Sequence, residues 1–155
     1  MSVTGRSHPC HPLTACSVVC DPVPKLKSIL IAEDEPDTAN LLQFHLQRRG
    51  YHTTVAADGA STLNLSFERH PDLVILDLML PKVHGFEVCR MLKTSPSTRH
   101  IPVFMLTAAA STENKVQGFK LGANDYMTKP FAMPELLARV ESLLRDARAR
   151  ETSTP

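Results

Sequence analysis

Residues Pro71–Pro81 read PDLVILDLMLP, and Leu73–Leu76 within them are four consecutive apolar residues, two of them β-branched. Such an unbroken apolar run is typical of a strand that is covered on both faces in a parallel sheet. Asp77 follows where this strand should end. Because ligands of open α/β sheets bind at the carboxyl ends of strands, Asp77 is a candidate for chemistry. An Asp that only initiates the turn before Pro81 would fit the same sequence.

Length and charge narrow the classes of protein that fit this chain. Its 155 residues suit one domain with a proper hydrophobic core. The 17 basic and 16 acidic side chains almost cancel, unlike the strong positive charge of a nucleic-acid or polyanion binder. No apolar run approaches the ~20 residues that a membrane helix requires, so we expect a soluble protein without a membrane segment.

The N-terminal residues differ in composition from the rest of the chain. Residues 1–24 are rich in Ser, Thr, Pro, His and Cys and show no sustained apolar period, so we expect a flexible extension. Soft metal ligands are present in it, but their spacing is not a familiar structural-zinc pattern, and a tail without metal is preferred. These candidate ligands are His8, Cys10, His11, Cys16 and Cys20.

The cysteines indicate the redox setting. Three of the four lie in the first 20 residues, and Cys89 falls inside a predicted helix. A secreted, disulfide-framed fold would spread its cysteines through the domain, so this usage indicates a reduced, cytoplasmic protein.

Five β–α units follow from residue 25 onward. The second helix is expected to carry Ala60, Leu63 and Phe67 inward, and the fourth bears Val116 and Phe119 as its apolar residues. Strands alternating with helices predict an α/β fold, a doubly wound parallel sheet of five strands with helices on both faces. The predicted strands are Ile29–Ala32, Tyr51–Ala56, Leu73–Leu76, Ile101–Leu106 and Asn124–Met127, and the last helix begins at Pro134.

Polar residues follow four of the predicted strands. Glu33 and Asp34 follow the first strand, Asp77 the third, Thr107 the fourth and Lys129 the fifth. Right-handed crossovers place the carboxyl ends of all these strands on one side, so we expect the five side chains to gather there. The chain has no Walker loop, dinucleotide-binding glycine motif or nucleophile elbow, which argues against nucleotide-binding and hydrolase versions of the fold.

This set of residues fits phosphoryl chemistry on a carboxylate. Glu33, Asp34 and Asp77 provide the oxygen ligands that Mg²⁺ prefers, and an Asp can form an aspartyl phosphate. Lys129 supplies a positive charge and Thr107 a hydroxyl donor for phosphoryl oxygens. Each residue alone could be a helix cap, a turn or a loop residue, so their joint placement carries the hypothesis.

Residues 27–144 resemble the receiver domain of bacterial two-component response regulators. The motifs that carry the resemblance occur in the family's order: EDE at Glu33–Glu35, DLMLP at Asp77–Pro81 with Gly85 beyond, TA at Thr107–Ala108, and GANDYMTKPF at Gly122–Phe131. The resemblance implies a CheY-like, flavodoxin-like sheet with strand order 2-1-3-4-5. It also implies a signalling domain rather than an enzyme.

By this resemblance, Asp77 accepts a phosphoryl group from a histidine kinase or a histidine phosphotransfer protein. Glu33, Asp34, Asp77 and the backbone carbonyl of Met79 would hold Mg²⁺. The family's pattern is not matched everywhere, because Glu33 stands where Asp is commoner. His84 stands where an Asp often precedes the glycine that corresponds to Gly85, and we assign it no catalytic role.

The resemblance also implies a switch. Thr107 and Lys129 would contact the phosphoryl group, with the hydroxyl of Thr107 moving toward it while the ring of Tyr126 turns inward. A new dianion would thereby change the surface of the fourth helix and fifth strand. Without the other motifs, Tyr126 would be interpreted as an ordinary aromatic residue of an edge strand.

The last third of the chain resembles the OmpR-type branch, whose receivers dimerise. Lys115, Asp125, Glu135 and Arg139 stand at positions that pair across that dimer, although solvated surface charges would have the same sequence. The expected partners are therefore the phosphoryl donor and either a protein target or a second copy. We expect a receiver at residues 25–148, a short tail at 149–155 and no direct binding of nucleic acid by this chain.

Two alternatives remain. We expect a stand-alone receiver that signals by protein contact, and the receiver half of a transcriptional regulator is the close alternative. A magnesium-dependent phosphatase or hydrolase of similar topology could also use Asp77 as its nucleophile. Such an enzyme usually needs a second acid beside the leaving group, and Leu78 and Met79 provide none.

Overall fold

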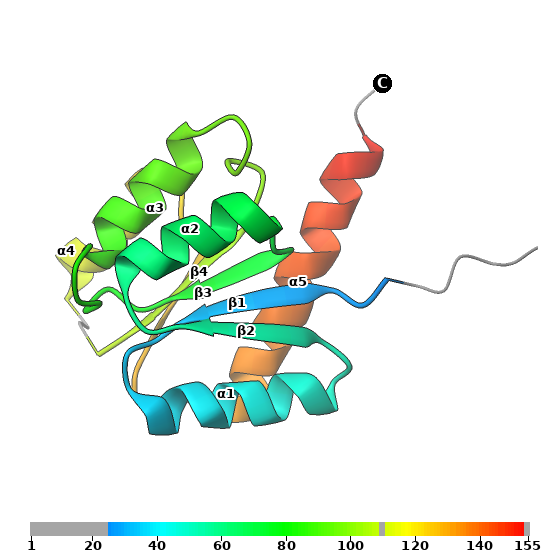
Figure 1. Cartoon of the computed structure of the whole chain (residues 1–155), viewed down its shortest axis with the longest axis horizontal. Helices are drawn as coiled ribbons and strands as arrows, with labels where there is room; N and C mark the ends of the chain where they lie inside the picture. The colour runs from blue at the N-terminus through cyan, green and yellow to red at the C-terminus, as the bar shows by residue number, and fades with distance from the viewer. Residues whose placement is uncertain (1–24, 109–110, 154–155) are drawn as a thin grey trace, which may run out of the picture.

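The computed structural model describes residues 25–108 and 111–153, which alternate strands and helices throughout (Figure 1). The predicted N-terminal extension, with its candidate ligands, lies outside the described residues. The strands are β1 (Ser28–Ala32), β2 (His52–Ala56), β3 (Leu73–Leu76), β4 (Val103–Thr107) and β5 (Asp125–Thr128). The helices are α1 (Pro36–Arg48), α2 (Gly59–Arg69), α3 (Gly85–Thr94), α4 (Thr112–Lys120) and α5 (Met133–Thr152).

All five strands form one parallel sheet in the order β2-β1-β3-β4-β5. This confirms the predicted fold class and strand order. The apolar run Leu73–Leu76 is β3, at the centre of the sheet, and all four of its residues are buried. β2 is an edge strand, which explains its more polar sequence.

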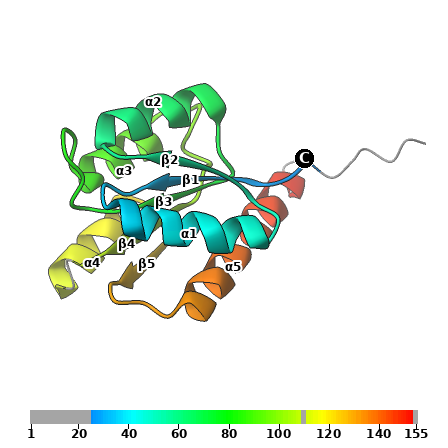
Figure 2. The same cartoon turned by 60° about the horizontal axis from the view of Figure 1, so that its bottom comes forward.

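Helices cover both faces of the sheet, as Figures 1 and 2 show from two directions. Alternate strand residues point to opposite faces, so Leu30 and Leu76 pack with α2 and α3, whereas Ile31 and Ile75 pack with α1 and α5. α4 packs beside β5. Among the described residues, no helix combines the length and apolar character needed to cross a bilayer.

One expectation about a helix face is wrong, and the apolar residues of α4 are exposed as well. Phe67 of α2 is 38% exposed, because this helix buries Leu63 together with Thr62 and Ser66. Val116 and Phe119 of α4 are 46% and 44% exposed. α4 turns Gly118 inward instead, so close to β4 that an added Cβ would lie 2.8 Å from the sulfur of Met105.

The C-terminal end also differs from the expectation. α5 continues to Thr152, so the helix includes most of the tail predicted from residue 149. Its buried residues, which include Leu136, Val140 and Leu144, repeat with helical spacing and anchor it on the sheet.

Candidate functional site

The strand ends bring the predicted polar residues to one edge of the sheet. Glu33, Asp77 and Lys129 each follow the last residue of a strand, and Thr107 ends β4. Backbone hydrogen bonds extend the sheet past the strand ends and hold these residues in place. They run from the N–H of Asp77 to the carbonyl of Ala32, 3.0 Å, and from the N–H of Lys129 to the carbonyl of Thr107, 2.9 Å.

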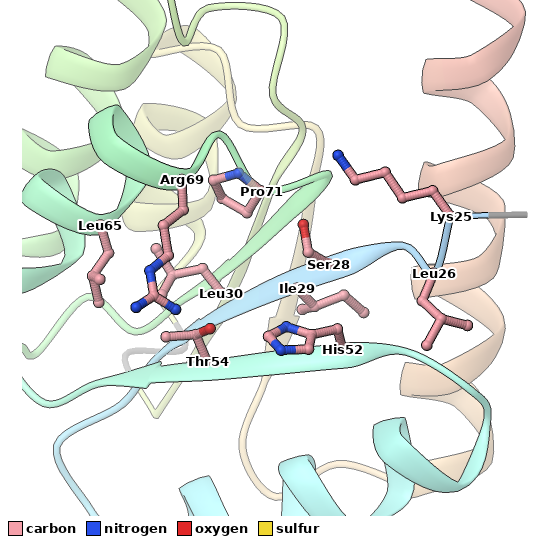
Figure 3. A pocket seen from close by; sticks show the side chains of 10 residues that line it. All are labelled: Lys25, Leu26, Ser28, Ile29, Leu30, His52, Thr54, Leu65, Arg69 and Pro71. Atoms are coloured by element: carbon pink, nitrogen blue, oxygen red, sulfur yellow. The ribbon is translucent and has the colours of Figure 1, made fainter. Parts of the chain in front are cut away.

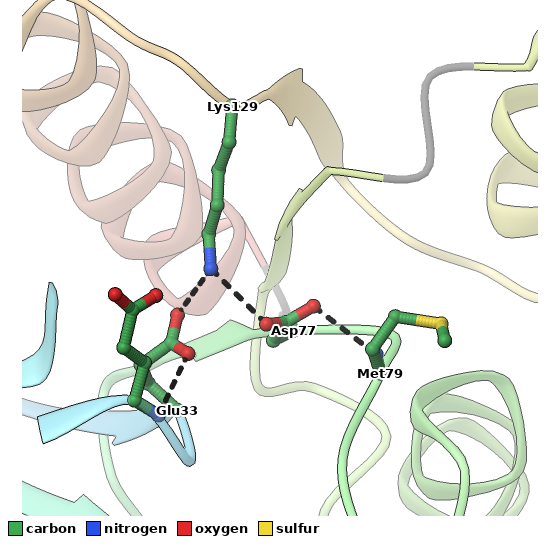
Figure 4. Close-up of polar contacts among 5 residues, drawn as sticks. Glu33, Asp77, Met79 and Lys129 are labelled. Carbon is green, nitrogen blue, oxygen red and sulfur yellow. Dashed lines mark hydrogen bonds and ion pairs between the residues drawn. The ribbon is translucent and has the colours of Figure 1, made fainter.

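Lys129 bridges two carboxylates from different strands (Figure 4). Its Nζ lies 2.5 Å from Oε2 of Glu33 and 3.1 Å from Oδ2 of Asp77. Burial lowers the pKa of Lys129, but the hydrogen bonds to both acids outweigh it and raise that pKa. For Glu33, burial raises the pKa, and the hydrogen bonds from Lys129 and from the N–H of Glu35 offset this only in part. The ammonium group is therefore held firmly charged between the two acids.

Both carboxylate oxygens of Asp77 are held by hydrogen bonds. Oδ1 accepts a hydrogen bond from the N–H of Met79 at 3.1 Å, while Oδ2 faces Lys129. The residue is 6% exposed, so its carboxylate is oriented but reaches the surface. Gly85 allows α3 to begin directly against this loop, because an added Cβ would lie 2.5 Å from the carbonyl oxygen of Asp77.

His84 has a local structural role that the sequence did not suggest. Its Nδ1 accepts the N–H of Phe86 at 3.3 Å and caps α3. The usual N-capping residues are Ser, Thr, Asp and Asn, so the sequence gave little indication that His84 caps α3.

The acidic residues form a cluster that suits a hard cation. Glu33, Asp34 and Asp77 each offer an oxygen atom, and these atoms lie within 4.8 Å of one another. Glu33 and Asp77 are buried, whereas Asp34 is exposed, so the cluster opens to solvent. Three carboxylates with one neutralising lysine leave an excess of negative charge that fits Mg²⁺, which needs few protein carboxylates and retains waters.

The two predicted switch residues are both buried. Thr107 has no exposed surface, and Tyr126 is 5% exposed although β5 is an edge strand. The ring of Tyr126 packs in the same core cluster as Met105, close to Gly118. Burial and then the negative charge of Asp77 raise the pKa of the Tyr126 phenol, so this ring lies within electrostatic reach of the acidic cluster.

Three of the four predicted dimer residues are neighbours within the chain. Arg139 on α5 donates to Oδ1 of Asp125 at 2.7 Å and to Oε1 of Glu135 at 3.1 Å. Lys115 is exposed on α4. Their role in a dimer stays a prediction.

The fold and the site together define an α/β domain with an acidic cluster that could hold a metal ion at the carboxyl ends of its strands. Comparison with known families identifies the class further. The model of the response regulator receiver domain family matches residues 29–141. The chain therefore belongs to this family, as its motifs predicted.

Relatives and solved structures agree with this assignment. The DNA-binding dual master transcriptional regulator RpaA of Synechocystis is 49% identical over 117 residues, 76% of this chain and 48% of RpaA. The phosphate regulon transcriptional regulatory protein PhoB of Rhizobium meliloti is 42% identical over 129 residues, 83% of this chain and 57% of PhoB. The chain thus spans about half the length of the curated relatives that it matches.

Among solved structures, the BeF3-activated N-terminal receiver domain of Klebsiella pneumoniae RstA is 31% identical, with a TM-score of 0.72. The match covers 77% of this chain and 99% of that one. A response regulator receiver domain from Francisella is 35% identical with a TM-score of 0.73, covering 77% and 98% of the two chains. These relatives lend no support to the phosphatase alternative.

Proposed function

We propose that this chain is a phosphoacceptor in a two-component phosphorelay and that Asp77 carries the phosphoryl group. The observation that carries the proposal is the double fixing of the Asp77 carboxylate by Lys129 and the N–H of Met79 inside an acidic cluster. Membership of the receiver family supports it. The donor would be a histidine kinase or a histidine phosphotransfer protein.

In the proposed step, a carboxylate oxygen of Asp77 attacks the phosphorus of a phosphohistidine. The new P–O bond forms as the P–N bond breaks, and the leaving imidazole takes up a proton from solvent. Glu33, Asp34, Asp77 and the carbonyl of Met79 would hold Mg²⁺, which when bound neutralises charge on the phosphoryl oxygens. Lys129 already lies 3.1 Å from Asp77 and would transfer its hydrogen bond to a phosphoryl oxygen.

The phosphorylated state would be sensed by Thr107 and Tyr126. The hydroxyl of Thr107 would donate to a phosphoryl oxygen, and the buried ring of Tyr126 would be stabilised in its inward position. The protein would then signal by a changed surface rather than by turning over a substrate. A cytoplasmic location fits this role.

The surface that changes would be the face built by α4, β5 and α5. Val116 and Phe119 expose apolar surface on α4, beside the charged side chain of Lys115. Asp125, Glu135 and Arg139 contribute a charged network from β5 and α5. We propose that this face binds a second copy or a protein target after phosphorylation. α5 ends at Thr152, so the receiver would extend from residue 25 to residue 152.

Acetyl phosphate tests the proposal without a kinase. With Mg²⁺ it should add one phosphoryl group to the wild-type chain, measured by intact-protein mass spectrometry, and none to Asp77→Asn. Asp72→Asn is the matched control, because Asp72 precedes the same strand at its opposite end and bonds Ser28. Equal labelling of wild type and Asp77→Asn would place the acceptor elsewhere.

A further inference from the structure

A pocket lies at the amino-terminal end of the sheet, opposite to the acidic cluster (Figure 3). Its volume is about 460 Å³, within the range of small-molecule sites. Among the described residues, it is lined by the amino-terminal ends of β1 and of the edge strand β2 together with residues of α2. Ser28 and His52 face it as paired neighbours, and so do Leu30 and Thr54.

The floor of this pocket is apolar. Leu30 and Pro71 are buried beneath it, and Leu65 of α2 forms a half-buried wall. Leu26, which is 63% exposed, lies at its rim. Because Leu30 and Pro71 are already buried, an apolar molecule would gain free energy mainly by covering the exposed side chain of Leu26 and the half-buried side chain of Leu65.

The charged side chains at the rim of the pocket are all basic. Arg69 reaches over β1 from the end of α2, and Lys25 reaches toward Pro71 from the other side, with the ring of His52 on β2 (Figure 3). None of the described residues that line the pocket carries a carboxylate. Within the part of the chain that the structure describes, the side chains of Lys25, His52 and Arg69 have no hydrogen-bond or ion-pair partner.

We propose that this pocket binds a small amphipathic anion, with its anionic head at the guanidinium group of Arg69 and its apolar body along the floor toward Leu26. An aryl or medium-chain carboxylic acid is the simplest ligand of this class. Arg69 provides a planar pair of donors that suits a carboxylate. The site is separate from phosphoryl transfer, because it lies at the strand ends opposite to Asp77.

The test ligand is 1-naphthylacetate. Its amide has the same apolar body without the negative charge and serves as the neutral control ligand. Backbone ¹H–¹⁵N NMR of the full chain should show saturable shifts at Ser28, Leu30, Thr54 and Leu65, with the signal of Asp77 unmoved. The neutral amide should bind about tenfold more weakly, as expected for the loss of a charge-assisted hydrogen bond.

Two variants separate charge from shape. Arg69→Gln should weaken the anion about tenfold and leave the neutral amide unchanged. Arg145→Gln on α5 is the control and should change neither, because α5 packs on the other face of the sheet. Thr54→Trp should fill the pocket and abolish binding of both ligands, while labelling of Asp77 by acetyl phosphate reports an intact fold.

Three results would overturn the proposal. The first is equal binding of the acid and its amide. The second is unchanged affinity for the anion in Arg69→Gln. The third is the absence of saturable shifts around β1 and β2, including shifts that appear only at the acidic cluster.

Discussion

The ammonium group of Lys129 lies 3.1 Å from Oδ2 of Asp77, although 52 positions separate the two residues in the sequence. The same group lies 2.5 Å from Oε2 of Glu33, which follows the last residue of β1. One cation thus neutralises two buried carboxylates at the point where a phosphoryl group would be added. The same ion pairs that orient Asp77 for phosphoryl transfer therefore also stabilise this end of the sheet.

Removing this cation should destabilise the protein. Lys129→Met leaves two buried carboxylates without their partner, so the free energy of unfolding in the absence of divalent ions should fall by about 2 kcal/mol. Added Mg²⁺ should restore part of the loss, as measured by urea unfolding. Lys27→Met is the control, because Lys27 pairs with Asp72 at the surface and should matter little. A variant as stable as wild type without Mg²⁺ would contradict this view of the cluster.

Crowding at the start of α3 should affect both stability and labelling. Gly85→Ala places a Cβ 2.5 Å from the carbonyl oxygen of Asp77, so the loop must shift, at a cost of about 1–3 kcal/mol. Labelling by acetyl phosphate should slow at the same time. Gly50→Ala also strains the backbone, at a φ of 86°, but meets no atom within 4 Å and lies away from the site. Gly50→Ala should leave the labelling rate unchanged. Equal slowing of labelling in both variants would contradict the view that crowding beside Asp77 causes the effect.

The buried thiol of Cys89 should react slowly below its raised pKa. Burial raises this pKa to about 11, from an ordinary value of 9.0, so the folded chain holds less reactive thiolate at pH 8. The test uses a variant in which Cys10, Cys16 and Cys20 are replaced by Ser, so that Cys89 is the remaining thiol. At pH 8, iodoacetamide should alkylate Cys89 about 100-fold more slowly in the folded chain than in the unfolded chain. The folded rate should rise with pH up to about 11. Equal rates for the folded chain and the chain in urea would show that the thiol is accessible.

Dimerisation should depend on Arg139. If the face of α4, β5 and α5 associates after activation, sedimentation velocity should show a monomer in the absence of beryllofluoride. With beryllofluoride and Mg²⁺ it should show a dimer. Arg139→Ala removes the group that orders Asp125 and Glu135 and should weaken the dimer about tenfold, since a network at an interface is worth more than one exposed pair. Arg145→Ala is the control. An activated wild type that stays monomeric would leave a protein target as the occupant of this face.

Local sequence signals were sufficient for the sheet and for the position of the site. The run Leu73–Leu76 predicted a buried strand, because an unbroken apolar run of this length is typical of a strand that is covered on both faces. Because all strands are parallel, their carboxyl ends lie at one edge of the sheet, which brings Asp77 and Lys129 together. The family motifs then identified the roles that these residues are expected to have.

Features that depend on packing between distant elements could not be predicted in this way. Phe67 and Phe119 have helical spacing typical of a core face, yet Ser66 and Gly118 occupy the buried positions because small residues let the helices approach the sheet. The ion pair between Lys129 and Glu33 joins residues 96 positions apart, and the spacing of the motifs does not predict such a contact. The pocket beside Arg69 lies at the amino-terminal ends of β1 and β2, and the sequence pattern gave no sign of it.

The measurement that tests phosphoryl transfer to Asp77 most directly is peptide mapping after borohydride reduction, which converts an aspartyl phosphate to homoserine. After treatment with acetyl phosphate and Mg²⁺, tandem mass spectrometry should find homoserine in place of Asp77, and untreated protein should contain none. A folded chain that reacts at Asp34 instead, or shows no reduced residue at all, would contradict the account.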